Sequence, residues 1–316
     1  MRVEQPPAVE SAIAALKSFQ HGDCSVLDVI ACGAQAIPAL RAILFEHERS
    51  GLFQARCRVV QALAALGAYD VLIEFLKANR SMADPVERVG EDAVINAAAL
   101  ALANVRAQCV FDLLLRLAER STLTGVIGAL GSFGRIEAIP VLIAALEEDA
   151  SRHTAETALR KLGKKAGPAL LIAVDSKAPS SGRESESSAR RRRSAFKLLE
   201  EMDGSRAAWQ RLRHLMRDDD AKLAARACAI GLTRGSASER TDAIRRLIEL
   251  LPQKDWVLRE EIEAYLTVHF ASARDMLVQY LKQFPLSLCD DTAKRWETEV
   301  ILRRIVARAA AERQAQ

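Results

Sequence analysis

One local pattern recurs along the sequence: an apolar helical run that ends in Ala-Leu, two variable residues, an apolar residue and glycine. Three copies are complete, at residues 62–67, 129–134 and 158–163, and a fourth at residues 101–106 has Arg106 in place of the final glycine. A helix commonly ends by placing its next residue in the left-handed conformation, which glycine adopts without a clash at Cβ. The pattern therefore predicts a helix that stops at each glycine, and a different kind of stop at Arg106.

A second helix is expected directly after each of these stops. Pro38, Pro140 and Pro168 stand where the first turn of such a helix would lie. Proline is tolerated in a first turn because the amide hydrogen that it lacks has no partner there. The sequence therefore predicts helices in pairs.

The spacing of the stops gives the size of the repeating unit. Residues 33, 67, 106, 134 and 163, taken as markers, are separated by 34, 39, 28 and 29 residues. One helix pair with its turns has this length. Apolar residues between the markers recur at intervals of three and four, as at Leu113, Leu114 and Leu117, which gives each helix a face to bury. Hydrophobic residues make up 50% of the chain but aromatic residues only 5%, so small aliphatic side chains allow close helix packing. The predicted fold is an all-α, right-handed solenoid of antiparallel helix hairpins.

These motifs resemble the HEAT-like, armadillo-type repeats, particularly the short bacterial repeats that also occur in phycobilisome lyases. Arg56 lies eleven residues before Gly67, and Arg152 lies eleven before Gly163, where that family often has an arginine in its second helix. The resemblance covers residues 24–174 and implies a fold. It implies no particular activity.

Three segments are expected along the chain. Residues 1–174 carry the regular repeats, and residues 175–195 interrupt them with small and polar residues that are typical of a flexible insertion. Residues 196–316 return to a helical pattern with longer, less regular pairs and end in a charged helix expected to cap the array, at about residues 292–311. We expect limited proteolysis to begin in the polar insertion.

Charge and cysteine content give little indication of a ligand. The chain has 45 basic and 41 acidic residues, a formal net charge of +4, which neither requires nor excludes a nucleic-acid partner. Its six cysteines are scattered singly, which indicates reduced thiols rather than a disulfide or metal framework. No stretch is apolar enough for a signal peptide or a membrane span, so a cytoplasmic bacterial protein without a membrane contact is expected.

The sequence supplies no catalytic motif, and we expect no cofactor and no metal. The dipeptide His47-Glu48 is a single copy of the signature that HEAT-like iron hydroxylases repeat, and one copy cannot supply paired ligand sets. Trp209, Trp256 and Trp296 match HEAT-like DNA glycosylases in residue type only, and each also fits an apolar helix stripe. Bilin lyase activity, the third possibility that the family suggests, has no identifiable chromophore-handling residues.

In a helical-hairpin solenoid the second helices line the concave side, so their polar residues form the usual docking surface. The candidate partner-binding residues on these helices are Arg56, Gln61, Asn96, Arg152, His153, Glu156, Arg226 and Arg259. Each could instead be exposed to solvent or pair with a neighbouring repeat. A separate candidate is the basic run Arg190, Arg191, Arg192 and Arg193, which could bind an anion or form a solvated helix start.

The function expected from these observations is a non-enzymatic scaffold or adaptor that binds a protein partner on its concave surface. The alternative is a nucleic-acid-binding protein of the DNA glycosylase type with a basic concave face. A face dominated by Arg and Lys with an exposed Trp would favour the alternative, and a mixed-charge face would favour the adaptor. The sequence leaves the oligomeric state open.

Overall fold

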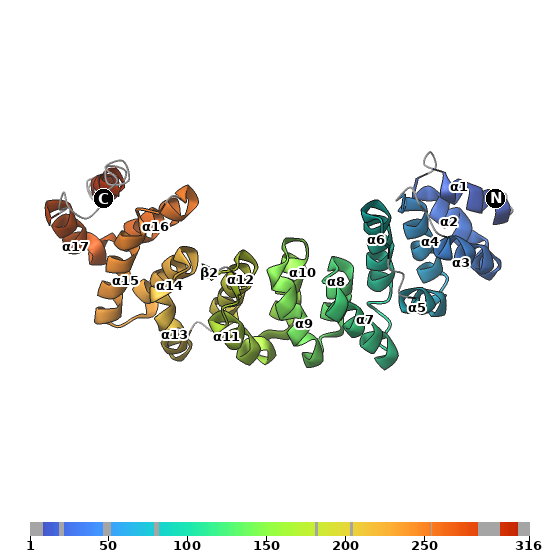
Figure 1. The fold of residues 1–316 in the computed structure, drawn as a ribbon, viewed down its shortest axis with the longest axis horizontal. Coiled ribbons are helices and arrows are strands. Elements are labelled where there is room, and N and C mark those ends of the chain that lie inside the picture. The colour runs from blue at the N-terminus through green and yellow to red at the C-terminus, as the bar shows by residue number, and fades with distance from the viewer. Residues whose placement is uncertain are drawn as a thin grey trace, which may run out of the picture. The chain divides into compact units, whose positions relative to one another are not determined.

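The predicted all-α fold of paired helices is confirmed by the computed structural model (Figure 1). It describes residues 9–18, 22–46, 52–78, 82–180, 183–202, 205–253, 255–283 and 298–308. The chain divides into two compact units, residues 1–198 (unit 1) and residues 199–316 (unit 2).

Unit 1 consists of helix pairs in two layers. Its helices are α1 (Val9–Lys17), α2 (Cys24–Ala31), α3 (Ile37–Phe45), α4 (Gln54–Ala65), α5 (Tyr69–Lys77), α6 (Pro85–Ala101), α7 (Gln108–Arg120), α8 (Thr124–Phe133), α9 (Ile139–Ala144), α10 (Asp149–Leu162), α11 (Gly167–Asp175) and the first part of α12 (Glu186–Met202). One layer contains α2, α4, α6, α8 and α10, each in contact with the next, and the other contains α3, α5, α7, α9 and α11 (Figure 1). The apolar faces of the two layers meet in a core of mainly Ala, Val, Leu and Ile side chains.

The glycines at the predicted stops have the backbone conformation that the sequence required. Gly67 and Gly134 have φ angles of 72° and 65°, and Gly33 and Gly163 also have positive φ. Without glycine, α6 ends differently: it stops at Ala101, and the Arg106 guanidinium stacks over the Phe133 ring and donates to the Ser132 carbonyl. The expected first-turn prolines are also present in α3, α9 and α11.

Unit 2 continues with longer and less regular pairs, and its four longest described helices have 13 or 14 residues. It contains α13 (Arg206–Leu212), the 3₁₀ helix η5 (Arg213–Arg217), α14 (Ala221–Arg234), α15 (Ala237–Leu250), α16 (Trp256–Val268) and α17 (Phe270–Gln283). Helix α14 contacts α15 and α16, and α15 contacts α17. Residues 298–308 are helical and bury Ile301 and Ile305, as expected for part of the terminal helix, whereas Trp296 lies outside the described residues.

The structure differs from the expected flexible insertion at residues 175–195. Strands β1 (Pro179–Ser180) and β2 (Arg183–Glu184) pair in antiparallel fashion, and residues 186–195 belong to α12. Arg192 is buried and donates from Nε to the Val174 carbonyl at 2.6 Å, while Lys197 pairs with Glu156 of α10. The first part of α12 therefore packs on α10 and α11, and the unit boundary lies at residues 198/199 rather than at the insertion.

Candidate partner-binding surface

Arg56, the first candidate docking residue, lies inside the protein. Only 8% of its side chain is exposed. Its Nε and Nη2 atoms donate to the Leu44 carbonyl at 3.0 and 2.9 Å, and Nη1 donates to Glu91 Oε2 at 2.5 Å. The arginine therefore satisfies a carbonyl at the end of α3 and joins α4 to α6. The expectation that Arg56 presents its charge to a partner is wrong.

Asn96 also connects two neighbouring helices. Its Oδ1 accepts a hydrogen bond from the backbone amide of Gly125 at 2.6 Å, at the start of α8. A Cβ atom at residue 125 would lie only 2.7 Å from the Asn96 Cα, so this approach depends on glycine. The contact fixes the spacing of α6 and α8.

Two further candidates form ion pairs between neighbouring helices. Buried Glu156 of α10 accepts from Lys197 Nζ of α12 at 2.9 Å, and Arg226 Nε of α14 donates to Glu200 of α12 at 2.9 Å. Arg259 is half-buried on α16. The sequence assigned Glu156 and Arg226 to the docking surface, whereas in the structure each links two helices, because polar side chains on packed helix faces must find partners.

Three candidates remain on the surface of the first layer. Gln61 of α4 and His153 of α10 are exposed. Arg152 is 36% exposed and pairs within its own helix with Asp149, at 2.6 Å. These residues remain candidates for contact with a partner.

The Arg190–193 run does not form an unpaired basic cluster. Arg190 pairs with Asp149 of α10, Arg191 with Glu147, Arg192 with Glu184 at 2.7 Å, and Arg193 with Glu186 at 2.9 Å. Four consecutive helical residues point in four directions, about 100° apart, so each reaches a different carboxylate. The run therefore forms links that hold α12 in place, rather than the anion site or the solvated helix start that the sequence left open.

Sequence reasoning missed the solvent face of α6. Val86, Val89 and Leu100 are 59%, 65% and 53% exposed, although they share a helix with buried Val94 and Ala98. The positions 86, 89, 93, 97 and 100 recur at three and four residues and lie on one side of the helix. All five are Val, Ala or Leu, so this side carries no charge. The spacing was readable from the sequence, but it resembles an ordinary core stripe.

This apolar face meets the next two helices of the layer at Gly128 of α8 and Thr154 of α10. A Cβ at Gly128 of α8 would stand 3.4 Å from Leu100 Cδ2 and 3.4 Å from Thr154 Cγ2 of α10. Leu100, Gly128 and Thr154 are therefore neighbours across three helices. We call the side chains of Val86, Val89, Ala93, Ala97 and Leu100, with Gly128 beside them, the α6 face.

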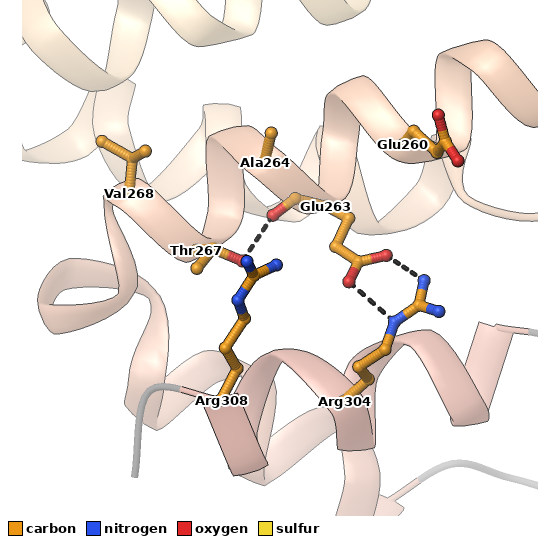
Figure 2. A pocket seen from close by; sticks show the side chains of 7 residues that line it. All are labelled: Glu260, Glu263, Ala264, Thr267, Val268, Arg304 and Arg308. Atoms are coloured by element: carbon orange, nitrogen blue, oxygen red, sulfur yellow. Dashed lines mark hydrogen bonds and ion pairs between the residues drawn. The ribbon is translucent and has the colours of Figure 1, made fainter. Parts of the chain in front are cut away.

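Unit 2 has its own exposed apolar residues and a hollow of 510 Å³ between α16 and residues 298–308 (Figure 2). Trp256 and Val268 of α16 are 66% and 79% exposed. At the hollow, buried Glu263 accepts from Arg304 Nε at 2.7 Å in a two-point ion pair (Figure 2). The hydrogen bond to Glu263 raises the pKa of Arg304, and the pair anchors residues 298–308 to α16.

The three tryptophans have different environments. Trp209 is 1% exposed and belongs to the core, in agreement with the apolar stripe. For Trp256 the core interpretation is wrong, because this side chain is exposed at the start of α16. The neighbouring Asp255 accepts a hydrogen bond from Lys222, which lowers the pKa of Asp255. His47, Glu48 and Trp296 lie outside the described residues.

In the described part of the chain, no group of three His, Cys, Asp or Glu side chains is arranged to hold a metal ion. None of the described helices alone has the length and apolar composition to cross a membrane; only the bent pair of Cys24–Ala31 and Gly33–Phe45, taken together, meets both criteria.

No family model matches the chain, and no curated protein matches it significantly. Among solved structures, it is similar to the complex of CpcE and CpcF of phycocyanin lyase from Nostoc sp. PCC7120. The sequence identity is 20%, the TM-score is 0.35, and the match covers 85% of this chain and 98% of that chain. At this TM-score the similarity carries no functional weight, and the helical-repeat fold rests on the helices described above.

Proposed function

We propose that this protein is a non-enzymatic helical-repeat scaffold that binds a protein partner on the first layer of unit 1, with the α6 face as the centre of the contact. The observation that carries the proposal is the outward exposure of Val86, Val89 and Leu100 on one uncharged side of α6. Large apolar side chains gathered on an exposed face are typical of interaction sites. Burying one such side chain fully contributes about 1.5–3 kcal/mol.

The shape of the face favours an amphipathic helix as the element that the partner contributes. Its apolar positions recur at three and four residues over a helix of 17 residues, as in helix-to-helix packing. The small residues Ala93 and Ala97 lie between the larger Val89 and Leu100, and so leave room for side chains of an opposing helix. The absence of charge on the α6 face favours an apolar side of the partner.

A nucleic-acid partner is less well supported. Binding to phosphates needs a surface rich in Arg and Lys, and no basic residue lies on the α6 face. The exposed Trp256 is followed on the same helix by exposed Glu260 and Glu261, which would repel a phosphate backbone. The Arg190–193 run pairs with carboxylates of the same chain.

The proposal can be tested by affinity capture from a native bacterial lysate with and without nuclease, followed by mass spectrometry. The baits are the wild-type chain, Val89→Glu, Leu100→Glu and the control Ile172→Glu. Ile172 is 68% exposed on α11, in the other layer, so its substitution adds the same charge away from the α6 face. We expect a protein captured in stoichiometric amount by the wild type and the control, resistant to nuclease, and lost with both α6 variants.

Two outcomes would contradict the proposal. Capture that persists in both α6 variants would place the contact elsewhere, and capture abolished by nuclease would indicate a nucleic acid. Light scattering measures the molar mass of the purified chains. A wild-type dimer that Leu100→Glu converts to a monomer would show that a second copy of the chain covers the α6 face.

A further inference from the structure

Unit 2 contains a second hollow, in which arginines predominate. It has a volume of 710 Å³ and lies between η5 and α15. Arg213 and Arg217 reach it from η5, and Arg245 and Arg246 reach it from α15. His214 and Met216 complete the η5 side. The volume is within the range of small-molecule sites, about 300–1,000 Å³.

The carboxylates of this hollow are fewer than its arginines. Glu239, Asp242 and Glu249 stand against four guanidinium groups. Each of these carboxylates has one arginine partner: Arg213 with Glu239 at 3.3 Å, Arg245 with Asp242 at 3.0 Å, and Arg246 with Glu249 at 3.2 Å. Arg217 has no partner among the described residues.

The existing pairs leave much of the arginines' hydrogen-bonding capacity unused. The side chains of Arg213 and Arg245 are 55% and 57% exposed, and exposed pairs of this kind are weak. Glu239 is engaged elsewhere, because its Oε2 accepts from the Ser236 backbone amide at 2.7 Å. The Nε of Arg246 is buried and has no acceptor in the described part of the chain.

We propose that this hollow is a binding site for a small molecule that carries two linked phosphate groups. A phosphate brings up to two negative charges and three acceptor oxygens, and guanidinium groups bind it through two parallel hydrogen bonds. Arginines on two separate elements, η5 and α15, can each hold one phosphate. A ligand with a single carboxylate would gain little, because it would only replace one of the three protein carboxylates that already pair with these arginines.

This site is independent of the proposed function, since it lies in unit 2 and involves no residue of the α6 face. Its four arginines exceed its three carboxylates by one positive charge, so a dianion or trianion is attracted. The surplus positive charge lies on Arg217, the arginine without a partner in the described residues.

Titration calorimetry of the full chain with inorganic pyrophosphate tests the proposal. We expect one pyrophosphate per chain, with binding weakened about tenfold or more by Arg217→Gln and by Arg245→Gln, because each removes a charged hydrogen bond. Arg211→Gln is the matched control: it removes the same charge from an exposed residue two positions before Arg213, outside the hollow. Its affinity should stay within about twofold of wild type.

Equal weakening by Arg217→Gln and Arg211→Gln would show attraction to general surface charge and overturn the proposal. An absence of binding at millimolar pyrophosphate would also overturn it. Parallel titrations with orthophosphate and an Asp/Glu-rich peptide identify the ligand class. If orthophosphate and the peptide both bind more weakly than pyrophosphate, the result supports a diphosphate ligand. If the peptide binds more tightly than pyrophosphate, and this binding is lost with Arg217→Gln, the hollow recognises protein carboxylates instead.

Discussion

Arg56 and Glu91 form a buried ion pair between α4 and α6, with Nη1 and Oε2 2.5 Å apart and side chains 8% and 5% exposed. The Arg56 guanidinium also lies 5.4 Å from the centre of the Phe75 ring. Arg56 of α4 thus contacts α6, α5 and the end of α3. Arg56, which the sequence assigned to a docking surface, therefore holds four helices together.

Replacement of Arg56 by Met should lower the free energy of unfolding by about 3–5 kcal/mol, because it leaves the Glu91 carboxylate buried without a partner. The double variant Arg56→Met with Glu91→Leu should recover much of this loss, since no unpaired charge then remains. Urea unfolding followed by circular dichroism measures both. Exposed Gln61→Ala is the control, and an Arg56 variant as stable as Gln61→Ala would contradict this role.

Gly125→Ala should destabilise unit 1 by about 1–3 kcal/mol, because the added methyl group must push α8 away from the Asn96 backbone. Gly128→Ala is the contrasting variant. Gly128 lies inside the same helix, and a Cβ there would meet only side-chain atoms, at 3.4 Å, so alanine should stabilise by up to about 1 kcal/mol through its higher helix propensity. Urea midpoints that shift in the same direction for both variants would contradict the close contact of α6 with α8.

The capping box at the start of α15 should make part of the stability of unit 2 depend on pH. The hydrogen bond from the Ser236 backbone amide lowers the pKa of Glu239 from 4.5 to about 2. A lowered folded-state pKa contributes stability that is complete above pH 4.5 and is lost as the pH falls toward about 2. Glu239→Gln should therefore cost about 1–2 kcal/mol near neutral pH, and the difference from wild type should shrink in acid.

The control for this pH dependence is Glu249→Gln, which removes an exposed carboxylate that takes no part in a helix cap. It should change stability by less than about 0.5 kcal/mol at any pH. Thermal unfolding of the three chains from neutral to acid pH makes the comparison. A difference between wild type and Glu239→Gln that stays constant into acid would mean that the cap does not lower this pKa.

Trypsin should distinguish the two halves of the expected insertion. Lys177 and Arg183 are exposed outside any helix, whereas Arg190–193 lie in α12 and pair with carboxylates. Early cleavage is expected after Lys177 or Arg183, with Arg190–193 protected. Fragment masses from a short digestion identify the sites. Cleavage at Arg192 before Arg183 would show that α12 begins later in the chain than described.

The sequence determined the repeat and its boundaries. Gly67 and Gly134 end their helices with positive φ, as the Ala-Leu-x-x-apolar-Gly pattern predicted, and the first-turn prolines begin the helices that follow. These features could be predicted because they depend on the conformation of one residue and its nearest neighbours.

Only the tertiary structure decided which polar and apolar side chains face a neighbour and which face solvent. Arg56 and Gln61 lie on the same helix, yet one is buried against Glu91, 35 residues away, and the other is exposed. Val94 and Val89 are equally apolar, yet only Val94 is covered. The periodicity shows that a helix has an apolar stripe, but the rotation and spacing of the adjacent helices determine whether that stripe is covered, because the covering atoms come from distant parts of the chain.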